Sequence, residues 1–175
     1  MRIGLMGKMA SGKSTLAARI MQKYPNIKKL SLAEPVKEIA NNLFNMKNKD
    51  RHLLQQIGTK MREIDQDVWV DTLLRNINDC DDIIIDDVRF ENEIIKLKQA
   101  GFKIFYLDID EITQDKYLKE TYTKDYATHM QCRAHESEQA HTLKHMADKI
   151  IKYDCDLSSI LMLYSNDINC GCPSN

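Results

Sequence analysis

A glycine-rich loop follows a predicted strand and leads into a predicted helix in the first part of this sequence. Residues 2–6 are a short apolar run typical of a buried strand, and residues 14–23 carry apolar side chains at helical spacing. Residues 7–14 between them, GKMASGKS, fit the pattern G-x-x-x-x-G-K-[ST] without a gap. The glycines let the backbone curl so that successive N–H groups face inward, and the helix adds its own N-terminal donors. The stretch therefore predicts a loop that cradles phosphates.

The motif assigns a part to each residue of this loop. The ammonium group of Lys13 spans the β- and γ-phosphates, and the hydroxyl of Ser14 coordinates Mg²⁺. We therefore expect the phosphates of a nucleoside triphosphate to lie against Gly7, Lys8, Ala10, Ser11, Gly12, Lys13, Ser14 and Thr15.

The composition of the whole chain limits its possible domain class and binding partners. A chain of 175 residues with 43% hydrophobic and 29% charged residues suits one soluble domain. Its net charge of −1 creates no general field toward nucleic acid or an anionic membrane, so we expect neither as a partner. Five unevenly spread cysteines argue against a disulfide framework, and no signal-like or long apolar run is present. We expect a reducing, cytoplasmic setting, and the possibility of a homodimer stays open.

Strand-like and helix-like segments alternate along the chain. Expected strands are residues 2–6, 83–85, 103–107 and 149–153; expected helices are residues 14–23, 35–44, 53–62, 68–77, 91–99, 137–147 and 157–163. Such alternation predicts an α/β protein with a three-layer α/β/α P-loop NTPase fold and a mostly parallel five-stranded sheet. Residues 110–134 are polar and poorly periodic, which predicts a mobile excursion.

Acidic and basic residues gather at positions suited to a second ligand. Asp86 and Asp87 follow the strand at residues 83–85, where ligands lie in open α/β sheets. We expect Asp87 to hold Mg²⁺ opposite Ser14, with Asp86 as the adjacent alternative. Guanidinium forks match phosphate oxygens, so we expect Lys37, Arg62 and Arg89 to clamp an acceptor phosphate.

The loop alone leaves the class of nucleotide-binding protein open. A GTPase needs a guanine-reading Asn-Lys-x-Asp string, and the nearest sequence, residues 48–50, has the wrong spacing. No Asp-x-x-Gly switch follows a strand, and the chain is short for a motor domain. A small-molecule kinase is the class that remains.

Five strings carry a more specific resemblance: GKMASGKS, LAEPVKEIANNLF, LLQQIGTKMREIDQDVWV, DDVRFENE and RAHESE. With these strings in this order, the chain resembles the deoxynucleoside monophosphate kinases of bacteriophages, within the wider P-loop nucleoside monophosphate kinase superfamily. The resemblance implies transfer of the γ-phosphate of ATP to a deoxynucleoside 5′-monophosphate, with Mg²⁺ as cofactor. It implies one kinase domain over residues 1–163, acceptor-binding helices at about 32–78, a lid at about 110–140, and a flexible tail at 164–175.

The resemblance also implies roles for single residues. Lys13 would stabilise the charge on the transferred group, with Asp87 and Arg89 beside it and Arg133 reaching in from the lid. Gln55 and Trp69 would recognise the acceptor base, and Tyr153 and Asp154 would lie near the adenine of ATP.

Three alternatives stay open. In the first, the acceptor is another phosphorylated metabolite, such as dephospho-coenzyme A or phosphomevalonate. In the second, the protein is a regulator that holds ATP without turning it over. The third concerns a metal: His129, Cys132 and His135 have a spacing that suits structural zinc.

Overall fold

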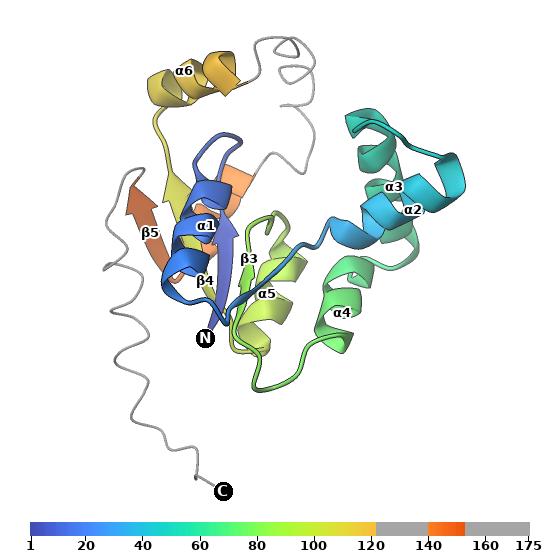
Figure 1. Ribbon diagram of the computed structural model, residues 1–175, viewed down its shortest axis with the longest axis horizontal. Helices are drawn as coiled ribbons and strands as arrows, with labels where there is room; N and C mark the ends of the chain where they lie inside the picture. The colour runs from blue at the N-terminus through green and yellow to red at the C-terminus, as the bar shows by residue number, and fades with distance from the viewer. Residues whose placement is uncertain (122–139, 153–175) are drawn as a thin grey trace, which may run out of the picture.

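A computed structural model describes residues 1–121 and 140–152, and the structural statements below concern those residues. Its centre is a sheet of five parallel strands in the order β2-β3-β1-β4-β5 (Figure 1). The strands are β1 (Arg2–Met6), β2 (Lys28–Leu30), β3 (Ile83–Ile85), β4 (Lys103–Asp108) and β5 (Lys149–Lys152). Because every pair is parallel, the carboxyl ends of all five strands lie at one edge, which is where ligands bind in such sheets.

Helices cover both faces of this sheet, and the pleat of β3 shows how the faces divide. Ile84 packs with helix α1 (Lys13–Lys23) on one face. Ile83 and Ile85 pack on the other face with α4 (Val68–Arg75) and α5 (Glu91–Gln99). The prediction of a three-layer α/β/α fold with a five-stranded parallel sheet is confirmed.

Helices α2 (Glu34–Phe44) and α3 (Arg51–Ile64) form a hairpin that stands beside the sheet (Figure 1). The hairpin has a small core of its own, which α4 completes with Trp69; its buried members are Val36, Ala40, Ile57 and Trp69. The indole Nε1–H of Trp69 donates a hydrogen bond of 3.2 Å to the carbonyl oxygen of Gly58. This contact ties the hairpin to the main body, since α4 also packs on the sheet.

Three elements differ from the sequence-based expectation. Strand β2 was not expected, because two lysines and one leucine show no apolar pattern; β2 lies at an edge of the sheet, where lysine is tolerated. Helix α6 (Glu111–Thr121) lies inside the expected excursion, and its weak amphipathic pattern hid it. Residues 140–146 form a 3₁₀-helix within the helix expected at 137–147.

Several expectations fall outside the described residues. They are the rest of the lid, the tail, the helix at 157–163, the His129–His135 cluster, and the site residues Arg133, Tyr153 and Asp154. Among the helices within residues 1–121 and 140–152, none combines the length and apolar character that crossing a membrane requires.

Candidate functional site

The glycine-rich loop leads from the end of β1 into the first turn of α1. Gly7 has φ +143°, and a Cβ there would lie 2.5 Å from the carbonyl oxygen of Leu107, so only glycine fits. The Nζ atom of Lys13 donates to the carbonyl oxygens of Gly7, at 2.8 Å, and Lys8, at 2.7 Å. The loop thus holds an ammonium group at its own rim, next to the N-terminal amides of α1.

Helix α6 contacts the glycine-rich loop at Lys8 and Met9. The side chain of Gln114 is 2% exposed, and its Nε2 donates to the carbonyl oxygen of Met9 at 2.8 Å. The Nζ atom of Lys8 also lies 3.9 Å from a carboxylate oxygen of Glu111. The loop conformation therefore depends on a segment more than 100 residues away, which no sequence pattern indicated.

Asp86 reaches from the carboxyl end of β3 to the start of α1. The Ser14 hydroxyl donates to Asp86 Oδ2 at 2.7 Å, and the Lys29 Nζ lies 2.7 Å from the same oxygen. A hydroxyl and a carboxylate that converge beside a phosphate loop are ligands that suit a hard cation such as Mg²⁺. Ser14 and Asp86 are therefore the residues here that suit Mg²⁺.

Asp87 faces the turn at residues 31–33 and not Ser14, so the expected preference for Asp87 over Asp86 as the Mg²⁺ ligand is reversed. Its Oδ2 accepts hydrogen bonds from the Ser31 hydroxyl at 2.7 Å and the Ala33 N–H at 3.0 Å, and its Oδ1 accepts one from the Leu32 N–H at 3.0 Å. Both carboxylate oxygens hold the turn that leads into α2. The geometry thus places Asp86, and not Asp87, against Ser14.

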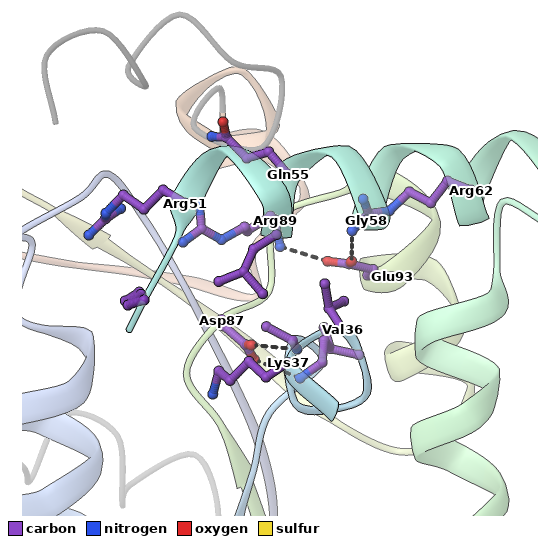
Figure 2. Close-up of a pocket in the computed structure, with 13 residues that line it drawn as sticks. Val36, Lys37, Arg51, Gln55, Gly58, Arg62, Asp87, Arg89 and Glu93 are labelled. Atoms are coloured by element: carbon purple, nitrogen blue, oxygen red, sulfur yellow. Dashed lines mark hydrogen bonds and ion pairs between the residues drawn. The ribbon is translucent and has the colours of Figure 1, made fainter. Parts of the chain in front are cut away.

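Two cavities open at this edge of the sheet. The P-loop cleft, of about 850 Å³, is lined by Lys13, Ser14 and Asp86 among others. The inner recess, of about 180 Å³, lies between the α2–α3 hairpin and the segment after β3 (Figure 2). Six residues line both cavities: Ala33, Lys37, Lys49, Arg51, Asp87 and Arg89. We call their place the junction; it carries four basic side chains and one acidic one.

The far part of the inner recess has a different lining. Seven residues line the recess and not the cleft: Leu32, Val36, Leu54, Gln55, Gly58, Arg62 and Glu93. The Arg62 guanidinium lies 3.9 Å from the centre of the Phe90 ring, and its Nη2 lies 3.6 Å from Glu93 Oε1. In Figure 2, Arg51 and Arg89 lie on one side of the recess, and Arg62 and Glu93 on the other.

Residues 3–144, well over half of the chain, match the family described as "AAA domain". The chain belongs to this AAA-domain family. A curated relative, named "Putative deoxynucleotide monophosphate kinase", from Acanthamoeba polyphaga mimivirus, is 27% identical over 150 residues. The match covers 65% of this chain and 76% of that protein.

Solved structures show the fold of this family member. The shikimate kinase of Bacteroides thetaiotaomicron is 16% identical with a TM-score of 0.56, and the match covers 96% of this chain and 98% of that one. The shikimate kinase of Acinetobacter baumannii, solved with shikimate, is 13% identical with a TM-score of 0.55 over 97% and 95% of the two chains. The AAA-domain protein described here therefore has the fold of P-loop kinases.

Sequence reasoning placed Trp69 at the acceptor base, and the structure corrects this. Trp69 is 3% exposed and packs in the hairpin core, and it lines neither the P-loop cleft nor the inner recess of this AAA-domain protein. The structure brings Lys37, Gln55, Arg62 and Arg89 to the recess.

Sequence reasoning also missed residues of the site: Lys29, Lys49, Arg51, Glu93 and Gln114. For Arg51 a signal existed. It lies one turn before Gln55 on α3, so extending the face of Gln55 back by four residues reaches it. Glu93 is the third residue of α5, and its side chain accepts a hydrogen bond from the N–H of Phe90 at the start of that helix. A glutamate at this position is part of the capping-box pattern, which is the signal that could have identified it.

Glu93 is the buried titratable group of the recess. Burial raises the pKa of this carboxyl from 4.5 to about 7, although the N–H groups of Arg89 and Phe90 and the charge of Arg62 oppose the rise. The two N–H groups donate to Oε2 at 2.8 and 3.0 Å. The carboxyl therefore changes its charge near neutral pH.

This raised pKa predicts a pH-dependent difference in stability. Protonated Glu93 stabilises the folded state fully below its unfolded pKa of 4.5, and this contribution is lost as pH rises through about 7. Between those values we expect the free energy of unfolding to fall by roughly 3 kcal/mol relative to Glu93→Gln, which stays neutral. Urea unfolding from pH 4.5 to 8 measures it, with exposed Glu91→Gln as the control. Parallel curves for wild type and Glu93→Gln would show that Glu93 has an ordinary pKa.

Proposed function

We propose that this protein transfers the γ-phosphoryl group of ATP to a deoxynucleoside 5′-monophosphate. The observation that carries the proposal is the junction, where Lys37, Lys49, Arg51 and Arg89 line both the P-loop cleft and the inner recess. Four basic side chains between a phosphate loop and a neighbouring recess suit a second anion held next to the first. The name of the mimivirus relative supports the same acceptor class.

On the donor side, the loop from Gly7 to Thr15 would bind the triphosphate through its N–H groups. Lys13 would leave its carbonyl partners for the β- and γ-phosphates and stabilise the charge on the transferred group. Ser14 and Asp86 would hold Mg²⁺. The positive charge held there would neutralise part of the negative charge on the phosphates.

On the acceptor side, the phosphate of the monophosphate would lie at the junction. An oxygen of that phosphate would form the new bond to the γ-phosphorus as the bond from phosphorus to the β–γ bridging oxygen breaks, which releases ADP. Arg89 and Arg51 would fix the acceptor oxygen in line by their guanidinium forks. Phosphoryl transfer depends mainly on such positioning and on positive charge, so no dedicated base is required.

The outer parts of the site are proposed on the resemblance. Arg133 would add a further positive charge to the transferred group, and Tyr153 and Asp154 would contact the adenine; all three lie outside the described residues. Asp87 would act by holding the turn at residues 31–33, which lies against the junction.

A coupled ADP-release assay over a panel of acceptors tests the proposal. The panel holds the deoxy- and ribonucleoside monophosphates, dephospho-coenzyme A, phosphomevalonate and shikimate, each with ATP and Mg²⁺. We expect release with at least one deoxynucleoside monophosphate and with none of the last three. Release with one of those three would change the acceptor, and ATP binding without release from any acceptor would identify a regulator.

A further inference from the structure

The inner recess has two ends with opposite electrostatic character. At the junction, Lys37, Lys49, Arg51 and Arg89 outnumber the acid that lines both cavities, Asp87, whose oxygens accept three hydrogen bonds. Lys37 also pairs with Glu34 of the cleft wall at 2.8 Å, and the net charge of the junction stays positive. At the far end the wall combines three apolar side chains with Gln55, and its charges are one arginine and one glutamate. An acceptor that has an anionic group and an uncharged ring therefore has one favoured orientation, with its anion at the junction.

Arg62 belongs to the far end, and its charge is already matched there. Its side chain is 22% exposed, and its guanidinium packs on the Phe90 ring at 3.9 Å and lies 3.6 Å from Glu93 Oε1. A phosphate that bound Arg62 would approach Glu93 as well, and above its pKa of about 7 this carboxylate would repel the phosphate. Arg62 is thus poorly placed to clamp a phosphate, which is the role that the sequence suggested.

Glu93 holds this arrangement together. One of its oxygens accepts the N–H groups of Arg89 and Phe90, and the other faces Arg62. A single buried carboxylate thus links the backbone of Arg89, at the junction, to the guanidinium of Arg62, at the far end.

Gly58 leaves the guanidinium of Arg62 accessible from the recess. It lies one turn before Arg62 on α3, and a Cβ at this position would lie 3.3 Å from Arg62 Nη1. Glycine in a helix interior is destabilising relative to alanine, so its presence here suits a need for space. Glycine at position 58 therefore lets Arg62 Nη1 lie close to the backbone of α3, at the wall of the recess that Gly58 and Arg62 both line.

We propose that Arg62 is a specificity-determining residue that donates hydrogen bonds to the uncharged ring end of the acceptor, and that Glu93 is the positioning residue that holds it there. This inference rests on the proposed function, in which the ring is the base of the monophosphate. The group it reads is a carbonyl oxygen or ring nitrogen on the edge of that base. The phosphate is left to the four basic residues of the junction.

Binding by calorimetry, with two ligands, tests the inference. One ligand is the nucleoside monophosphate that the wild type binds most tightly, and the other is deoxyribose 5-phosphate, which has the phosphate and lacks the base. For Arg62→Met we expect the Kd of the monophosphate to rise by about 10- to 100-fold, since hydrogen bonds from charged groups have that effect. The Kd values of deoxyribose 5-phosphate and ATP should stay within about twofold of the wild-type values.

Different failures point to different errors. An equal loss of affinity for both ligands would show that Arg62 binds the phosphate, and no loss for either would show that it does not contact the acceptor; each outcome overturns the inference alone. If the wild type binds no monophosphate, the proposed function fails as well. Arg62→Lys, which keeps the charge and loses the fork, should bind the monophosphate with intermediate affinity if the variant folds.

Glu93→Gln tests the positioning role by its pH profile. Arg62 faces Glu93 from α3, and Asp87 and Arg89 face it from the segment after β3. In the wild type, we expect the Kd ratio of the two ligands to change as pH falls from 8 to 6, because Glu93 then gains a proton. The phosphate titrates in the same range, but it does so in both ligands, so the ratio cancels it. The ratio should be independent of pH in Glu93→Gln; a pH-independent ratio in the wild type would overturn the positioning role.

Discussion

Replacing Lys13 with methionine will lower kcat for phosphoryl transfer by about 10²- to 10³-fold, the usual effect of removing one preorganised donor from a transition state. Lys13 lies where the loop meets α1, and its Nζ is held within 2.8 Å of two loop carbonyl oxygens. Methionine has a similar length and no charge, so the variant loses the ammonium group and little packing. Single-turnover ADP release at saturating ATP and acceptor measures the effect.

Lys23→Met is the matched control for this prediction. Lys23 is the last residue of α1 and is exposed, so its loss changes the charge of the same helix at its far end. We expect kcat within about twofold of wild type for the control and similar melting temperatures for both variants. A Lys13→Met protein that kept full activity would show that the loop does not act on the transferred group.

Replacing Asp86 or Asp87 by asparagine will have different effects on activity and stability. Asp86→Asn will lower kcat/KM by about 10²-fold or more, because a metal ion contributes several kcal/mol of charge stabilisation and Asp86 is the carboxylate beside Ser14. It will also raise the Mg²⁺ concentration needed for half-maximal activity. Asp87→Asn will instead lower the free energy of unfolding by about 1–3 kcal/mol.

Asp87→Asn lowers the free energy of unfolding because asparagine has fewer hydrogen-bond acceptors than aspartate. Asp87 accepts from Ser31, Leu32 and Ala33 with both oxygens, whereas an asparagine has one oxygen and must turn its NH₂ group toward at least one donor. Urea unfolding and Mg²⁺ titrations of activity on both variants measure the difference. The assignment of the metal position to Asp86 is wrong if Asp87→Asn is the variant that loses Mg²⁺ dependence while keeping its stability.

Local chemistry explains which parts of this protein were predictable from sequence. The phosphate loop depends on residues that are neighbours in the chain, namely Gly7, Gly12, Lys13 and Ser14, and their spacing encodes the backbone shape directly. Strand β3 and helix α5 match the expected bounds, since each has a complete local pattern and clear ends. Helix α6 has a weak pattern and was expected to be an excursion.

The pleat of the sheet explains why Asp86, and not Asp87, faces Ser14. Alternate residues of a strand point to opposite faces, so Asp86 continues the face of Ile84, which packs with α1. Ser14 lies at the start of that helix and meets Asp86 there. Two adjacent aspartates look equivalent in sequence, and the choice between them depends on which face α1 covers.

The phosphate loop and the alternation of strands and helices could be predicted from sequence alone, because they follow from residues that are close in the chain. Three features became visible in the folded chain: which basic residues meet at the junction, the pairing of Arg62 with the buried Glu93, and the packing of Trp69 in the core. Those outcomes depend on how the α2–α3 hairpin docks beside β3. Such docking is a long-range packing result that no local pattern of side chains encodes.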